Sequence, residues 1–146
     1  MSEQEAFEVK YSTAALTIAE NKAWRWSARP AQCTLGAALI ASRRPLTSLG
    51  AMTAEDALLF GEIVALAERV TRTILAPDKF NCLALMMIDS HLHFHFIPRY
   101  AGSRTAYGLI FADGGWPGFP DLTAKQGEAS QLSGMLAALR AGAGNE

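Results

Sequence analysis

The segment SHLHFHFIPRY, residues 90 to 100, constrains the fold more than any other part of the chain. It places His91, His93 and His95 at alternate positions, with large apolar residues between them. Because side chains alternate between the two faces of a β-strand, the segment predicts a strand with one apolar face and one imidazole face. The apolar face belongs to a core. The imidazole face predicts a functional surface rather than a solvated one, since core histidines usually occur singly, each with its own partner.

The other periodic segments predict an α+β fold: a mainly antiparallel sheet of about five strands, a long helix and a shorter C-terminal helix. The remaining strands are expected at 14–21, 23–30, 34–45 and 80–88, the last as a central strand. An apolar stripe of helical period between Thr53 and Pro77 predicts the long helix, and residues 130–141 predict the shorter one. Because strands and helices do not alternate, the order favours helices packed on one face of the sheet.

Length and composition indicate a single domain over residues 1–146, with its core in 13–100 and a C-terminal extension in 101–146. The net charge of -1, without a Lys/Arg-rich block, argues against a nucleic-acid partner. Two cysteines form no disulfide framework, and both are expected to be buried. The polar N-terminus lacks a secretion signal, and the longest apolar run is too short for a membrane span. We therefore expect a cytoplasmic protein without a membrane partner.

Metal binding is one chemistry that a His-x-His strand supports. Same-face neighbours on a strand lie about 6.5 Å apart, whereas a zinc to nitrogen bond is only about 2 Å, so three successive rings crowd one ion. At most two of the histidines would bind, and carboxylates such as Asp89 would have to complete the set. A metalloprotein is therefore the less favoured alternative, and no metal or other cofactor is expected.

Phosphoryl or nucleotidyl transfer suits a row of imidazoles better. A neutral imidazole can attack phosphorus, and its neighbours can donate hydrogen bonds to the phosphoryl oxygens. Adjacent rings also disfavour one another's protonation, which helps to keep the attacking ring neutral near pH 7. Arg99, just beyond the strand, is a candidate for an additional anion contact.

Two segments of the sequence resemble a known family. HLHFHFIPR resembles the histidine triad (HIT) motif, His-φ-His-φ-His-φ-φ with φ apolar, followed by Pro-Arg, of a superfamily of nucleotide hydrolases and transferases. LGAALIASRRPLTSLGAMTAEDA, residues 35–57, resembles the strand, basic turn and helix start of the same family. The resemblance implies a homodimer with a nucleotide bound over the sheet. It also implies hydrolysis or transfer on dinucleoside polyphosphates, nucleoside phosphoramidates or a related conjugate.

The resemblance assigns a role to each histidine by its position in the motif. His93, the central one, would be the nucleophile that takes the nucleotidyl group at the α-phosphorus. His91 would help to orient His93 through a hydrogen-bond relay, and His95 would contact the phosphate or the leaving group. This histidine chemistry requires no metal ion.

The sequence departs from the family pattern at three places. Many members carry a histidine directly after the glycine equivalent to Gly36, but this chain has Ala37. Eight positions earlier, where many members hold the ribose with an acidic or amide residue, it has Arg29. The loop before the triad is the short LMMIDS, residues 85–90. These departures leave open a non-catalytic nucleotide-binding module as the alternative function.

Three further residues are candidates for substrate contacts. Asp89 and Ser90 are expected to supply polar contacts in the tightened turn, or else simply to form that turn. Trp116, in DGGWPGFPDL, is expected to stack on the base, because an indole face is large and rigid. The alternative for Trp116 is a packing anchor of its own loop.

Overall fold

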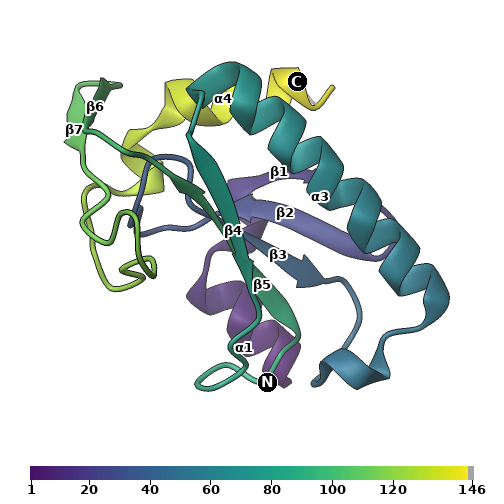
Figure 1. Cartoon of the computed structure of the whole chain (residues 1–146). Helices are drawn as coiled ribbons and strands as arrows, with labels where there is room; N and C mark the ends of the chain where they lie inside the picture. The colour runs from purple at the N-terminus through teal and green to yellow at the C-terminus, as the bar shows by residue number, and fades with distance from the viewer. Residues whose placement is uncertain (145–146) are drawn as a thin grey trace.

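The structure, a computed structural model, describes residues 1–144 and confirms the α+β fold. Five strands form one antiparallel sheet in the order β1-β2-β3-β5-β4 (Figure 1). The strands of this sheet are β1 (Thr17–Glu20), β2 (Trp24–Ala28), β3 (Ala38–Ser42), β4 (Lys79–Leu83) and β5 (His93–Arg99). The helices are α1 (Glu3–Lys10), α2 (Thr13–Leu16), α3 (Ala54–Leu75) and α4 (Ser133–Gly142), with short 3-10 turns at Leu49–Ala51 and Ala129–Gln131.

Helix α3 covers one face of the sheet, as its apolar stripe predicted (Figure 1). Its first turn is closed by a capping box, in which the Thr53 hydroxyl accepts from the Asp56 N–H at 3.1 Å. The Asp56 carboxylate in turn accepts from the Thr53 N–H at 2.7 Å. The Phe60 ring then packs against Trp24 of β2, with ring centroids 4.9 Å apart.

Helix α1 covers the opposite face, which the sequence prediction of helices on one face missed. The Ser2 side chain caps α1 by accepting a hydrogen bond from a first-turn N–H at 3.1 Å. Phe7 of this helix is buried against Leu39 and Ala41 of β3. Because Leu39 and Ala41 alternate with the β3 residues that face α3, the sheet lies between two helices.

Two other predictions were wrong near β4. The apolar run 80–88 is not a central strand, because β4 ends at Leu83 and pairs only with β5, at the edge of the sheet. The chain then turns into a loop in which Met87 and Ile88 are 86% and 90% exposed. Cys82 is exposed rather than buried, because it lies on this edge strand. Residues 14–16, expected at the start of a strand, belong instead to helix α2.

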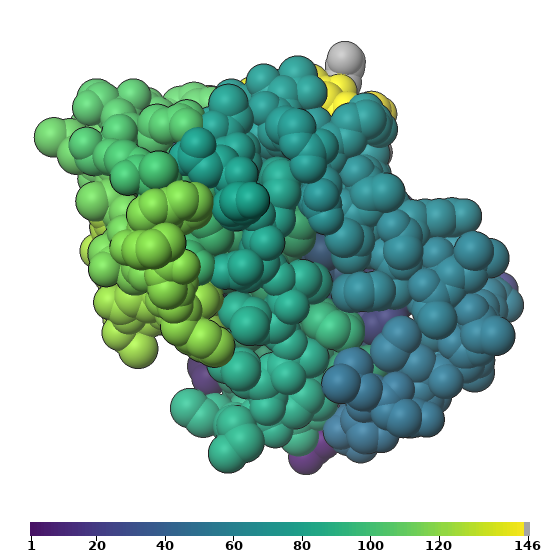
Figure 2. Space-filling view, viewed as in Figure 1, coloured from purple at the N-terminus to yellow at the C-terminus, as the bar shows by residue number. Residues whose placement is uncertain are grey.

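The C-terminal extension packs against the rest of the chain. It begins with a hairpin of β6 (Arg104–Ala106) and β7 (Leu109–Phe111), and it ends with α4 beside α3. Met135 and Leu139 of α4 are buried in the same hydrophobic core as the five-stranded sheet. Figure 2 shows the loop that follows β7 as a lobe next to β4. Within residues 1–144, no helix is long and apolar enough to cross a membrane.

A buried ion pair joins this loop to β5. The Arg99 guanidinium donates from Nε and Nη2 to the two Asp113 carboxylate oxygens, at 2.6 and 3.1 Å, and these side chains are 4% and 1% exposed. Asn81 accepts from Nη1 of the same guanidinium at 2.7 Å. Burial raises the pKa of Asp113, but the bonds from Arg99 outweigh it and leave the pKa below its usual value.

We predict that Arg99→Met lowers the free energy of unfolding by about 3 kcal/mol, because it leaves the Asp113 carboxylate buried without its counter-ion. The matched control is Arg72→Met, which removes a solvent-exposed pair with Glu68 and a cation–π contact with Phe80 and should cost no more than about 1 kcal/mol. Urea denaturation of both variants measures the difference. Equal losses in the two variants would show that the Arg99 pair adds no more than a surface contact.

Candidate active site

Strand β5 presents the histidines on the face that α1 covers. His93 pairs with Ala41 and His95 with Leu39 of the neighbouring β3, and His91 lies just before β5. Phe94 and Phe96 point to the other face, where the main hydrophobic core lies against α3. The alternation predicted from the sequence is therefore confirmed.

Main-chain carbonyls fix the tautomers of the first two histidines. Nδ1 of His93 lies 2.6 Å from the carbonyl oxygen of His91, and Nε2 of His91 lies 2.8 Å from the carbonyl oxygen of Ser42. A carbonyl can only accept, so in each pair the ring nitrogen carries the proton and donates. In neutral His93 the lone pair is therefore on Nε2. The link from His91 to His93 runs through the His91 carbonyl rather than through its ring.

Burial makes these imidazoles weak bases. It lowers the pKa of His91 and of His93 below the usual value, and the hydrogen bonds to the Ser42 and His91 carbonyls offset this only in part. Burial, assisted by the positive charge of Arg29, lowers the pKa of His95 to about 4. All three rings are consequently neutral near pH 7. The His95 ring meets the His93 ring edge-on, with centroids 5.1 Å apart.

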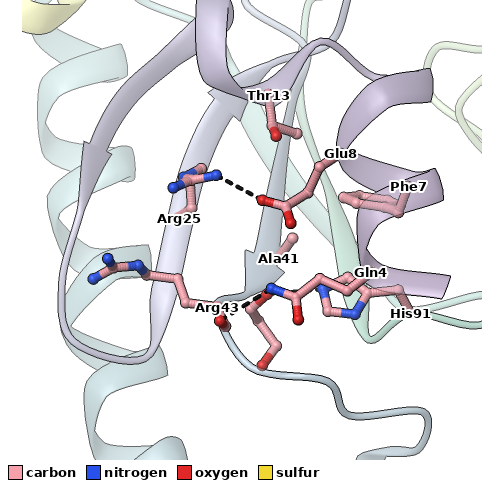
Figure 3. Close-up of a pocket in the computed structure, with 9 residues that line it drawn as sticks. Gln4, Phe7, Glu8, Thr13, Arg25, Ala41, Arg43 and His91 are labelled. Atoms are coloured by element: carbon pink, nitrogen blue, oxygen red, sulfur yellow. Dashed lines mark hydrogen bonds and ion pairs between the residues drawn. The ribbon is translucent and has the colours of Figure 1, made fainter. Parts of the chain in front are cut away.

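His93 and His95 line a pocket of about 170 Å³. Its walls come from the end of α1, the loop that follows β4 and the C-terminal segment; they are Lys10, Tyr11, Leu85, Met86, Met87, Ile88, Asp89 and Leu122. His91 faces a separate hollow of about 110 Å³, which Figure 3 shows between α1 and the sheet. His93 and His95 thus share one cavity. His91 lies outside it and contacts His93 through its main-chain carbonyl.

Helix α1 shields the nucleophile candidate from solvent. The Phe7 ring centroid lies 4.8 Å from that of His93 and 5.2 Å from that of His91, and His93 is only 3% exposed. The end of the helix is held by Asp89, which accepts from Lys10 Nζ at 2.9 Å and from the Tyr11 hydroxyl at 3.0 Å. The low exposure explains why burial dominates the pKa of His93.

Sequence reasoning missed α1 and its contribution to the site, although two signals were present. Ser2 followed by Glu5 is the spacing of a capping box, and Phe7 followed by Tyr11 is the spacing of neighbours on one helix face. A helix of 8 residues has little stability of its own, so its docking on the histidines depends on tertiary contacts.

Of the other predicted contact residues, Asp89 lines the pocket, whereas Ser90 and Trp116 do not. Asp89 lines the pocket, but its carboxylate is bound to Lys10 and Tyr11. Ser90 lies outside the pocket, in a shallow hollow beside α1. Trp116 is half-buried in the loop after β7 and is not one of the residues that line the pocket. Of these residues, only Asp89 is brought next to His93.

The predicted anion contact by Arg99 is not supported. Arg99 shares the face of the histidines, but it lies beyond Ile97 and uses its guanidinium on Asp113 and Asn81. Two other cations lie near the histidines. Lys10 lines the pocket but is paired with Asp89, and Arg29 is close enough for its charge to lower the pKa of both His93 and His95. In the sequence, Arg29 stood out only as a departure from the family pattern.

Metal ligation is not favoured by the arrangement of donors. Among residues 1–144, no group of three or more His, Cys, Asp or Glu side chains is placed to hold a metal ion. In addition, His91 faces a different hollow from His93 and His95, so the three rings do not converge on one point.

No family model matches the sequence, and no curated protein matches it. Solved structures do. A histidine triad protein from Bradyrhizobium japonicum is 24% identical, with 86% of this chain and 88% of that chain covered and a TM-score of 0.66. A zinc-bound histidine triad family protein from Mycobacterium smegmatis is 18% identical, with 98% and 96% covered and a TM-score of 0.66.

A third structure is the diadenosine triphosphate hydrolase of Plasmodium falciparum in complex with cyclomarin A. It is 9% identical, with 86% of this chain and 74% of that chain covered and a TM-score of 0.62. At these identities the likeness is one of fold. The chain therefore has the fold of the histidine triad proteins, and the resemblance indicated by its HLHFHFIPR segment is confirmed at that level.

Proposed function

We propose that the chain is a nucleotidyl hydrolase or transferase that works through a covalent nucleotidyl-histidine at His93. Its substrate is a nucleotide conjugate, either a dinucleoside polyphosphate or a nucleoside phosphoramidate. The observation that carries the proposal is the 2.6 Å hydrogen bond from His93 Nδ1 to the His91 carbonyl, which leaves the lone pair on Nε2 of a neutral, pocket-lining ring. The likeness in fold to a diadenosine triphosphate hydrolase supports the same class of reaction.

The reaction has two steps. In the first, the Nε2 lone pair of His93 forms a bond to the α-phosphorus, and the bond from phosphorus to the leaving group breaks with its electron pair. The leaving group takes up a proton from solvent, which the proton released in the second step restores. In the second, water or another acceptor attacks the same phosphorus and loses a proton, and the nitrogen to phosphorus bond breaks. The nucleoside monophosphate or its adduct leaves, and neutral His93 is restored.

The neighbouring groups support both steps electrostatically. His93 becomes cationic when Nε2 is bonded to phosphorus, and the His91 carbonyl that accepts its Nδ1–H then stabilises that charge. His95 lies edge-on to His93 in the same pocket, where it can donate to a phosphoryl oxygen or to the leaving group. The dry surroundings strengthen each of these interactions.

A non-catalytic nucleotide-binding module is the second candidate, and one observation favours it. Phe7 packs against the ring of His93, which is only 3% exposed, so the candidate nucleophile offers little surface to a substrate. A zinc site, as in the Mycobacterium smegmatis protein, is less favoured because the described residues provide no group of three ligands.

We also propose that the protein acts in the cytoplasm as a homodimer. The edge strand β4 supports self-association, because pairing on one side only leaves main-chain N–H and C=O groups available to another strand. The exposed Met87 and Ile88, in the loop that follows β4, add apolar surface next to that edge.

Mass spectrometry of the intact protein tests the covalent step. After brief mixing with adenosine phosphoramidate or a diadenosine polyphosphate, the wild type should gain the mass of one adenylyl group and His93→Ala should not. His95→Ala is the matched control, because it removes a phosphate contact but keeps the nucleophile, so the adduct should form about 100-fold more slowly. An adduct that forms on His93→Ala in the same yield as on the wild type would contradict the proposal.

The pH dependence of kcat/KM tests the protonation state of His93. Only neutral His93 can attack, and a pKa below 6.5 in the folded protein keeps the ring neutral to lower pH, so the acid limb should have its midpoint below 6.5. A phosphoramidate substrate is assayed from pH 4 to 8, with circular dichroism recorded in the same buffers to show that the protein stays folded. A midpoint at or above 6.5 would contradict the dry environment of His93.

A further inference from the structure

Arg29 is a buried cation with no anionic partner. The residue follows β2, is 9% exposed, and donates from Nη1 to the Cys33 Sγ at 2.9 Å and from Nη2 to the Leu122 carbonyl at 3.0 Å. Both acceptors are neutral, and a thiol accepts weakly. Among residues 1–144, no carboxylate lies within ion-pair distance of this guanidinium.

Such a charge is unusual, because arginine cannot become neutral by losing a proton as a buried lysine or histidine does. A buried guanidinium therefore normally has a carboxylate beside it. Arg99 follows this rule through Asp113. Arg25, which precedes Arg29 on the same face of the sheet and is only partly buried, also has carboxylate partners, with Glu8 at 2.9 Å and Glu20 at 3.0 Å; Figure 3 shows the Glu8 contact.

The guanidinium lies next to the pocket of His93 and His95. The main-chain N–H of Arg29 donates to the Ala37 carbonyl at 2.9 Å. Ala37 lies two residues before Leu39, the β3 residue that pairs with His95, so Arg29 and His95 lie on neighbouring rows of the sheet. Its charge lowers the pKa of both pocket histidines. Leu122, whose carbonyl accepts from Arg29, is one of the residues that line the pocket, whereas Arg29 itself is not.

Two other polar groups near Arg29 also lack partners within residues 1–144. Ser27 Oγ and His95 Nδ1 are buried without a hydrogen bond. Ser27 pairs with Leu39 and Leu39 pairs with His95, so these two residues occupy one row across the sheet, beside Arg29. A hydroxyl and an imidazole without partners, together with a guanidinium without a counter-ion, form a set that the oxygens of an anion would satisfy.

We propose that Arg29 binds a second phosphate group of the substrate, next to the phosphorus that His93 attacks. This inference rests on the function proposed above and narrows its substrate class. Arg29 does not line the pocket of His93. The phosphate that it binds is therefore the one adjacent to the attacked phosphate, not the attacked phosphate itself. In binding, the phosphate oxygens replace the Leu122 carbonyl as the acceptor for Nη2.

The protein therefore acts best on nucleotides that carry at least two phosphate groups. The second phosphate lies either further along the polyphosphate chain or on the ribose, and the charge chemistry is the same in both. A nucleoside phosphoramidate with a single phosphoryl group leaves Arg29 unpaired and is the poorer ligand.

Calorimetric titration separates these possibilities without requiring turnover. The ligands are AMP, ADP and adenosine 3′,5′-bisphosphate, and the protein is His93→Ala, in which no covalent step on His93 can occur. We expect ADP or the bisphosphate to bind at least tenfold more tightly than AMP. ADP alone would place the second phosphate in the chain, and the bisphosphate alone would place it on the ribose.

Arg29→Met, added to His93→Ala, should abolish this tenfold gain and leave the affinity for AMP within about threefold. Arg29→Lys keeps a charge without the fork of donors and should retain part of the gain. Arg25→Met is the matched control, because Arg25 of β2 lies on the same face as Arg29 but is neutralised by two carboxylates, so the gain should persist. Thermal unfolding of each variant without ligand shows whether it is folded. If Arg29→Met is not folded, the proposal is judged from the affinities of Arg29→Lys.

Two results would overturn the proposal. The first is that AMP binds as tightly as both doubly phosphorylated ligands before Arg29 is changed. The second is that Arg29→Met weakens AMP and ADP to the same extent, as expected if Arg29 only anchors Cys33 and Leu122 or contacts the attacked phosphate. Neither result bears on the covalent step at His93, which the mass measurement tests separately.

Discussion

The two-faced strand β5 is the constraint on which the rest of the structure depends. It lies between β3 and β4, so its main chain is paired on both sides, and its side chains are forced to opposite faces of the sheet. Phe94 and Phe96 require a hydrophobic layer on one face, which α3 supplies. The histidines on the other face require hydrogen-bond acceptors and a covering layer, which the carbonyls of Ser42 and His91 and helix α1 supply.

The covering layer sets the chemistry of the imidazoles. Helix α1 packs Phe7 on His91 and His93, and the C-terminal segment adds Leu122 beside His95. Removal of water lowers the basicity of all three rings, and the main-chain carbonyls of His91 and Ser42 then select the tautomers. A neutral ring with a directed lone pair is thus a product of packing. Histidine in water would be partly protonated near its ordinary pKa.

Charge is distributed unevenly over this face. The ion pairs of Lys10 with Asp89, Arg25 with Glu8 and Arg99 with Asp113 each close a contact between segments distant in the sequence. Arg29 closes its contacts with neutral acceptors instead, so its charge remains available inside the protein. The same residue type is therefore neutralised by a carboxylate in one row of the sheet and buried without a counter-ion in another. Sequence proximity to the histidines did not distinguish them, since Arg99 was the closer candidate.

The sequence by itself determined the parts of this protein that depend on local periodicity. Alternation set the two faces of β5, the 3.6-residue stripe set α3, and the spacing of the histidines within HLHFHFIPR placed them on one face. Only the tertiary structure decided that β4 is an edge strand, that α1 covers the histidines, and that Arg29 rather than Arg99 lies beside them. The physical reason is that periodicity reports which side of an element is apolar. The partner of a side chain, by contrast, depends on which distant segments pack against it, and no pattern within one segment encodes that choice.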